Sequence, residues 1–143
     1  PLPTERKYDF LFLGHLRKEK GIEILLEAWT LFHTSHPQAN LCIAGFAPFG
    51  FDKSKYTGMN IDFILQFLSD EQYFNLGSTA RCVILPYTRG TNSGVVSTLV
   101  TFNNDIITSD LDMFKSNSLL SQELMFECGN PQALVQKMEQ VLQ

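Results

Sequence analysis

The residues best placed to do chemistry are polar side chains that follow short apolar runs. The clearest case is the stretch 85–102, which begins as the end of an apolar run, is stopped by Pro86 and continues as a loop rich in Gly, Thr, Asn and Arg. Ser93-Gly94 then opens a run that suits a helix. A strand end, a polar turn and a helix start bring free backbone N–H groups and a positive dipole end to one place. The stretch therefore predicts an anion site, with an ordinary strand–helix connection as the alternative.

A second set of candidates is basic and lies near the start of the first predicted helix. Lys20 stands where its ammonium can meet an anion held by backbone N–H groups, and the alternative is a solvated helix start. His15 directly follows the first predicted strand and could donate to a phosphate or a sugar hydroxyl, or be a plain loop histidine. Arg17 and Arg89 are expected to be solvated, with one of them able to touch a phosphate.

Several other sites are excluded by their missing motifs. The chain has no Gly-x-Gly-x-x-Gly after its first strand and no Gly-x4-Gly-Lys-Ser/Thr, so neither a dinucleotide fingerprint nor a P-loop is present. The aspartates of a phospho-receiver domain are absent after the first strand, and no nucleophile triad or metal cluster is legible. Carboxylates near the expected anion site are few, Asp110 being one. The sequence thus predicts binding more clearly than catalysis.

Composition sets the class of protein. A chain of 143 residues with 44% hydrophobic residues fits one globular domain, 1–143. The net charge of −4 argues against a partner that is nucleic acid or a membrane surface. Cys42, Cys82 and Cys128 are too far apart for a disulfide framework or a zinc signature, which favours a reducing compartment. With no membrane-spanning run and no secretory signal, we expect a cytoplasmic location, and the start at Pro1 suggests a piece of a longer chain.

Apolar runs and helical stripes alternate along the chain. Helical patterns begin near Ile22, Ser69, Ser93, Asp110 and Asn130. Short apolar runs predict strands over 8–13, 41–44, 61–67, 82–85, 106–108 and 124–126. This alternation predicts an α/β fold, an open doubly wound (Rossmann-like) parallel sheet of about six strands with helices on both faces. Ligands in such sheets bind outside the carboxyl ends of the strands.

Helix boundaries are also predicted. Ser69 and Gln72 form a capping box at the start of one helix, and Asn130-Pro131 gives another an N-cap followed by an N1 proline. His36 closes the first helix. The stretch 46–60 has no clean period and predicts a long loop with one short helical turn.

In their order and spacing, several motifs resemble the donor-binding domain of GT-B glycosyltransferases of the family-4 type. The resemblance covers nearly the whole chain, from about Tyr8 to Leu142. The segments that carry it are Gly14-His15-Leu16-Arg17-Lys18-Glu19-Lys20-Gly21-Ile22, Leu41-Cys42-Ile43-Ala44-Gly45, Phe67-Leu68-Ser69-Asp70-Glu71, Cys82-Val83-Ile84-Leu85-Pro86-Tyr87, Ser93-Gly94-Val95-Val96 and Gly129-Asn130-Pro131.

The resemblance implies a two-domain hexosyltransferase with its active site between the domains. This chain would be the C-terminal, nucleotide-sugar-binding half, inactive in isolation. Its partners would be a nucleoside-diphosphate sugar, as donor substrate with no further cofactor, and an N-terminal half that binds a glycan or lipid-linked acceptor. Peripheral membrane contact would run through that other half. Bacterial surface-polysaccharide synthesis is the expected setting.

Site residues follow from the same resemblance. Lys20 corresponds to the family's diphosphate lysine, Ser93 and Gly94 begin the helix that faces the donor phosphates, and Leu68 and Ser69 would lie near the base. The full set of expected substrate-binding residues is Gly14, His15, Arg17, Lys20, Leu68, Ser69, Tyr87, Asn92, Ser93, Gly94 and Val95.

Two departures from the family pattern leave an alternative open. His15 replaces the family's phosphate arginine. Gly90 and Thr98 stand where the family has two glutamates that contact the donor sugar and the ribose. A catalytically inactive nucleotide-binding or interaction domain of the same fold is therefore the rival hypothesis. A flavodoxin-like module, which would bind flavin, is a third.

Overall fold

The computed structural model describes residues 6–90 and 95–143. At its centre is a six-stranded sheet, every pair of neighbouring strands parallel, in the order β3-β2-β1-β4-β5-β6. The strands are β1 Tyr8–Leu13, β2 Leu41–Ala44, β3 Ile61–Ile64, β4 Ala80–Leu85, β5 Asp105–Ser109 and β6 Met125–Phe126. The strand order reverses between β1 and β4, which is the switch point of a Rossmann-like sheet. The predicted fold class is confirmed.

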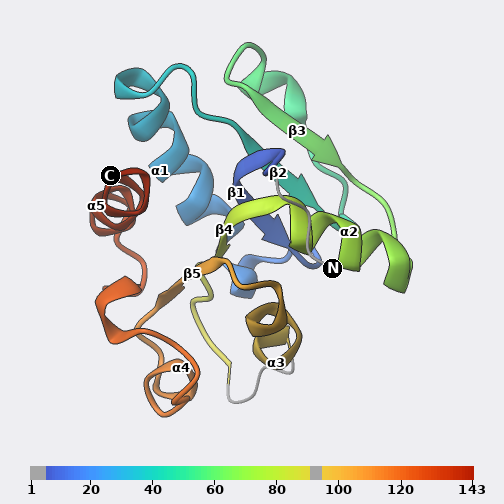
Figure 1. Cartoon of the computed structure of the whole chain (residues 1–143). Coiled ribbons are helices and arrows are strands. Elements are labelled where there is room, and N and C mark those ends of the chain that lie inside the picture. The colour runs from blue at the N-terminus through green and yellow to red at the C-terminus, as the bar shows by residue number, and fades with distance from the viewer. Residues whose placement is uncertain (1–5, 91–94) are drawn as a thin grey trace.

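Helices cover both faces of this sheet (Figure 1). α1 and α5 pack side by side on one face, while α2, α3 and α4 contribute to the core on the other. The α-helices are α1 Ile22–Ser35, α2 Asp70–Thr79, α3 Val95–Leu99, α4 Asp112–Lys115 and α5 Pro131–Leu142. The 3-10 turns are η1 Lys18–Lys20, η2 Lys53–Tyr56, η3 Val100–Phe102 and η4 Gln122–Leu124.

The two cores meet at β1, which is buried on both faces. Phe10 and Phe12 belong to the layer formed with α1 and α5, whereas Leu11 and Leu13 belong to the layer formed with α2, α3 and α4. The opposite directions of alternate side chains follow from the period of two in a strand. Trp29 of α1 is completely buried against Phe10, with ring centroids 6.2 Å apart. A fully apolar central strand is what a parallel sheet covered by helices requires.

The helix ends predicted from the sequence are confirmed. The Ser69 hydroxyl accepts from the Gln72 backbone N–H, and the Ser69 N–H donates to the Gln72 side chain, which completes the capping box of α2. The Asn130 side chain caps α5, with Pro131 at its first position. His36 ends α1, and its N–H donates to the carbonyl of Phe32. The short turn predicted within 46–60 is η2.

Several boundaries differ from the prediction. β4 begins at Ala80 and not at Cys82, β5 spans Asp105–Ser109 and not 106–108, and β6 begins at Met125 and not at Leu124. β3 ends at Ile64 and not at Phe67, since the chain turns at the sheet edge, where the Gln66 N–H donates to the carbonyl of Ile64. Among the described residues of the helix expected from Ser93, Val95–Leu99 are α-helical and Val100–Phe102 tighten into η3, in a stretch rich in β-branched residues with low helix propensity. Ser93 and Gly94 themselves lie outside the described residues. Lys20 lies in η1, one residue before the cap of α1.

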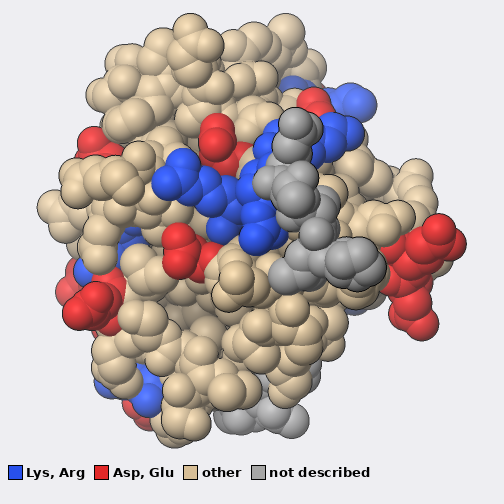
Figure 2. All heavy atoms as spheres, in the orientation of Figure 1, with Lys and Arg blue, Asp and Glu red and all other residues tan. Residues whose placement is uncertain are grey.

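Charge is mixed on the face shown in Figure 2. Lys and Arg side chains gather over β1 and β4 near its centre, and acidic side chains lie beside them. Arg6, at the start of β1, has a structural role, because its guanidinium donates to the carbonyls of Ser78 and Ala80. Over residues 6–90 and 95–143, no helix combines the length and the hydropathy needed to cross a bilayer.

Candidate functional site

A pocket of about 190 Å³ opens where β1, β2 and β3 end. This is the edge at which ligands bind in open parallel sheets. The pocket is lined by residue pairs that follow each of the three strands and by one side chain from the first turn of α2. These residues are Gly14, His15, Gly45, Phe46, Phe67, Leu68 and Tyr73. The structure thus brings together the predicted residues Gly14, His15 and Leu68 with Gly45 and Phe46, which follow the predicted strand 41–44, and with two residues outside the expected site, Phe67 and Tyr73.

The floor of the pocket depends on two glycines. The Gly14 N–H donates to the carbonyl of Ala44 at 3.0 Å, so the chain leaving β1 lies directly against the end of β2. A Cβ atom on Gly45 would lie 1.8 Å from the carbonyl oxygen of Gly14. Any side chain at position 45 would therefore displace the backbone at the end of β1.

Aromatic side chains form the wall of the pocket. Phe46 and Phe67 are stacked, with ring centroids 4.1 Å apart and an angle of 13° between the planes. His15 meets both rings edge-on, at 6.1 Å from Phe46 and 6.0 Å from Phe67. Phe67 is 67% exposed, which is unusual for so large an apolar side chain. An exposed aromatic stack beside a pocket is suited to packing against a flat ring of a ligand.

Beside this pocket, at the switch point between β1 and β4, η1 is docked on the loop that follows β4. The Thr88 N–H donates to the carbonyl of Glu19 at 3.0 Å. Gly21 lies so close to Pro86 that a Cβ atom would be 1.8 Å from the Pro86 carbonyl oxygen. The Lys20 ammonium lies over the ring of Tyr87, 4.4 Å from the centroid. Lys20 and Tyr87, predicted separately as site residues, are therefore in contact.

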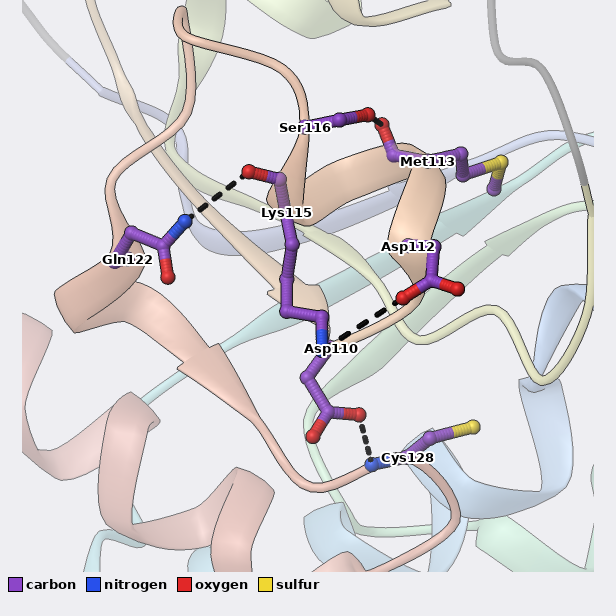
Figure 3. Close-up of polar contacts among 7 residues, drawn as sticks. All are labelled: Asp110, Asp112, Met113, Lys115, Ser116, Gln122 and Cys128. Atoms are coloured by element: carbon purple, nitrogen blue, oxygen red, sulfur yellow. Dashed lines mark hydrogen bonds and ion pairs between the residues drawn. The ribbon is translucent and has the colours of Figure 1, made fainter.

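The loop after β4 contacts the end of β5 and the segment that follows β6. The Ser109 hydroxyl donates to the carbonyl of Tyr87 at 2.6 Å. The Cys128 thiol lies 3.6 Å from that same carbonyl oxygen, and the Cys128 N–H donates to the carboxylate of Asp110 at 2.9 Å (Figure 3). Asp110 thus holds Cys128 in place, and Ser109 and Cys128 fix the backbone of Tyr87.

Two tyrosines connect the pocket with the lysine. Burial raises the pKa of Tyr73 to about 12, with a smaller contribution from Tyr87. Burial also raises the pKa of Tyr87. Both hydroxyls are therefore protonated and neutral at neutral pH, so they can donate hydrogen bonds without adding negative charge to the site.

The other predicted residues are placed as follows. Arg17 lies against the ring of Phe49, 5.8 Å from the centroid, and this phenylalanine is 84% exposed. Ser69 is exposed and uses its hydroxyl and its N–H in the capping box. Val95 is the first residue of α3. Asn92, like Ser93 and Gly94, is outside the described part of the chain.

Gly90 and Thr98, which stand where the resembled family has glutamates, differ in their surroundings. Gly90 has a φ of +149°, and a Cβ there would lie 3.0 Å from the terminal methyl of Met113, so the local backbone disfavours any side chain. Thr98 is exposed on α3 and lines an open groove of about 400 Å³ with Tyr73, Phe74 and Phe102. A substitution to glutamate would therefore be tolerated at Thr98 and strained at Gly90.

No metal site is formed by the described residues, in which no three His, Cys, Asp or Glu side chains come together. A larger groove of about 690 Å³ runs beside β3 at the other end of the sheet, between η2 and the start of β1. Because ligands of open parallel sheets bind at the carboxyl ends of strands, we assign the site to the smaller pocket and the neighbouring Lys20.

The profile of the family described as "Glycosyl transferases group 1" matches residues 2–143. The chain belongs to this family. Because the match spans the whole fold, it excludes the hypothesis that the chain is a flavodoxin-like module. No curated protein matches the sequence.

Solved structures agree in fold. The C-terminal domain of a glycosyl transferase group 1 family protein, LpcC from Francisella tularensis, is similar with a TM-score of 0.79 and 16% identity over 96% of this chain and 76% of that one. The sucrose-phosphate synthase of Thermosynechococcus elongatus is similar with a TM-score of 0.73 and 21% identity, over 93% of this chain and 35% of that one. A third similar structure is TarM, with a TM-score of 0.76 and 14% identity, over 97% of this chain and 29% of that protein. This group 1 chain therefore spans about a third of two of these proteins.

Proposed function

We propose that this chain is the nucleotide-sugar-binding half of a glycosyltransferase that moves a hexosyl group from a nucleoside-diphosphate sugar to a glycan or lipid-linked acceptor. The observation that carries the proposal is that an aromatic pocket and a lysine ammonium lie at the same edge of the sheet, in a chain of the group 1 family. The pocket would take the base, and Lys20 the diphosphate.

Lys20 would act on the leaving group. When the bond between the sugar and the diphosphate breaks, negative charge grows on the diphosphate. A cation fixed beside that charge stabilises the transition state more than the ground state. The predicted start of a helix at Ser93-Gly94 would add backbone N–H donors. His15, which lines the pocket, would donate to a phosphate or a sugar hydroxyl.

The rest of the enzyme would lie in a second domain that precedes this one. The chain spans 29% of TarM and 35% of the sucrose-phosphate synthase, so there is room in such proteins for an acceptor-binding half. Transfer would then need both halves, and this domain alone would bind its donor without turning it over. A cytoplasmic role in polysaccharide synthesis belongs to the same proposal.

The rival function is a nucleotide-binding or interaction domain that has lost turnover. Gly90 and Thr98 favour it, because neither can supply the carboxylates expected at those positions. Transfer or donor hydrolysis by a longer chain that includes the preceding half would decide against this rival, and nucleotide binding without turnover would support it.

The first test is binding of UDP and GDP to the 143-residue chain by titration calorimetry. We expect weak binding of one of them and loss of most of that binding in Lys20→Ala. Lys18→Ala is the matched control, since it removes an exposed positive charge from the same 3-10 turn. Absence of binding by the unsubstituted chain at millimolar nucleotide, or equal effects of the two substitutions, would contradict the proposal.

A further inference from the structure

The contact between Lys20 and Tyr87 is close and partly shielded from water. The ammonium nitrogen is 4.4 Å from the ring centroid, Tyr87 is 5% exposed and Lys20 is half-buried. A cation over the face of an aromatic ring is attracted by the ring's quadrupole, and more strongly where water is excluded. The ring is thus a binding partner for the charge of Lys20.

No carboxylate competes with this ring in the described part of the chain. The one ion pair among residues 6–90 and 95–143 joins Lys115 to Asp112, far along the sequence. Glu19, the neighbour of Lys20, makes its contact with the loop after β4 through its backbone carbonyl. The ammonium of Lys20 is therefore held in place without being neutralised.

The position of the ring is fixed on several sides. Its centroid lies 5.6 Å from that of Phe114, a buried residue of α4. The Tyr87 carbonyl accepts from the Ser109 hydroxyl at 2.6 Å. The next residue, Thr88, donates its N–H to the carbonyl of Glu19. The turn that carries the lysine and the loop that carries the ring are thus tied together at adjacent residues.

We propose that Tyr87 is a positioning residue, which holds the Lys20 ammonium where the phosphates of a nucleoside diphosphate bind. This inference rests on the proposed function of the site. A carboxylate in place of the ring would also hold the lysine, but it would cancel the charge that attracts the phosphates. The face of a ring occupies one side of the ammonium and carries no full negative charge, so the N–H groups that point away from the ring and the positive charge remain available to an anion.

A double-mutant cycle tests the proposal through UDP and GDP affinity, measured by NMR titration. Tyr87→Leu removes the quadrupole and keeps an apolar side chain, and we expect it to weaken binding about fivefold to thirtyfold. Tyr87→Phe keeps the ring and should restore binding to within about twofold of the unsubstituted chain. In a Lys20→Ala background, Tyr87→Leu should cause no further loss, because the ring then has no ammonium to hold.

Three results would overturn the proposal. The first is that Tyr87→Leu lowers nucleotide affinity equally in the presence and in the absence of Lys20. The second is that Tyr87→Phe binds nucleotide as weakly as Tyr87→Leu, and the third is that Tyr87→Leu binds nucleotide more tightly than the unsubstituted chain. The last result would mean that the ring sequesters the lysine from the ligand. Thermal unfolding of each variant separates these results from a general loss of structure. If Tyr87→Leu does not fold, the nucleotide affinity of Tyr87→Phe and the chemical shift of the Lys20 ε-methylene still test the proposal.

A second measurement needs no nucleotide, so it distinguishes failure of this inference from failure of the proposed function. Protons above an aromatic ring are shifted upfield, and we expect this shift for the ε-methylene of Lys20. The shift should persist in Tyr87→Phe and vanish in Tyr87→Leu. Lys7, whose ammonium lies 5.3 Å from the ring centroid of Tyr8, is an internal control that should not change. If the shift is present but no nucleotide binds, the contact exists and the proposed function is wrong; if the shift is absent, the positioning role is wrong.

Discussion

A Cβ atom on Gly21 would lie 1.8 Å from the carbonyl oxygen of Pro86, although the two residues are 65 positions apart in the sequence. The obstacle is backbone, which cannot move aside as a flexible side chain can. Gly21 also has a φ of +77°, in the left-handed region. The start of α1 and the loop after β4 can approach each other only because no side chain stands between them.

We therefore expect Gly21→Ala to be strongly destabilising. A left-handed φ alone costs a non-glycine residue about 1–2 kcal/mol, and the clash with Pro86 should bring the loss of unfolding free energy to about 3 kcal/mol or more. Gly58→Ala is the matched control, because its φ is +79° and no atom lies within 4 Å of the added Cβ. Denaturant unfolding of both variants measures the difference, and equal losses would mean that η1 does not dock on this loop.

A second prediction concerns Asp110 and its neighbour Asp112 (Figure 3). Asp110→Ala removes the acceptor of the Cys128 N–H and should cost about 1–2 kcal/mol of unfolding free energy, because a hydrogen bond to a charged group is lost. Asp110→Asn, which keeps an acceptor oxygen, should recover part of this. Asp112→Ala breaks only an exposed ion pair of 3.7 Å and should cost less than about 0.5 kcal/mol. A larger loss from Asp112→Ala than from Asp110→Ala would contradict this assignment.

Local features of the fold could be predicted from the sequence because they depend on neighbouring residues. The capping box of Ser69 and Gln72 spans three positions, and the apolar stripe of α1 that includes Trp29 follows the helical period. The sequence predicts that β3 ends at Phe67, whereas the strand ends three residues earlier, at Ile64. Leu65 and Phe67 extend the apolar pattern past Ile64, and what ends the strand is a turn in which the Gln66 N–H donates to the carbonyl of Ile64 at the edge of the sheet.

The pocket lies at the edge of the sheet where the sequence predicts that ligands bind, but only some of its residues are predictable. Gly14, His15 and Leu68, predicted from the rule that ligands bind at the carboxyl ends of parallel strands, lie around one pocket. Phe46 closely follows the predicted strand 41–44 and so lies at the predicted edge, whereas Tyr73 is not predictable, since an aromatic residue on a helix gives no sequence signal of the pocket it faces. The contact of Lys20 with Tyr87 joins residues 67 positions apart, and only the order of β1 and β4 in the sheet brings them together.

The buried thiols predict how stability depends on pH. Burial raises the pKa of Cys42 from 9.0 to about 12. Above pH 9 the unfolded chain loses this proton while the folded chain keeps it, so the unfolding free energy falls as pH rises from 9 toward 12, by up to about 1.4 kcal/mol per pH unit for one thiol. Below pH 8 the thiol should not affect how the unfolding free energy changes with pH.

Cys42→Ala tests this dependence. Below pH 9 the variant should be less stable because a buried group is lost, but its unfolding free energy should fall less steeply between pH 9 and 10.5, so that the difference narrows. Chemical unfolding in the presence of a reductant gives both profiles. Two profiles that stay parallel over this range would show that Cys42 titrates alike in the folded and unfolded chains.

The last prediction concerns the exposed aromatic wall. Phe67 is 67% exposed and stacks on Phe46, so Phe67→Ala should change the unfolding free energy by less than about 0.5 kcal/mol. If the pocket takes the base of a nucleotide, the same substitution should weaken UDP or GDP binding about tenfold, since stacking of one base on an aromatic ring contributes about 1–3 kcal/mol.

Leu119→Ala is the control for this prediction. It truncates a side chain that is 59% exposed and lines a groove near the start of β5, at the opposite end of the sheet. Calorimetric titration of both variants separates the two effects, because a general surface effect would weaken both alike. Unchanged affinity in Phe67→Ala together with lost affinity in Lys20→Ala would place the phosphates beside Lys20 and the base outside this pocket.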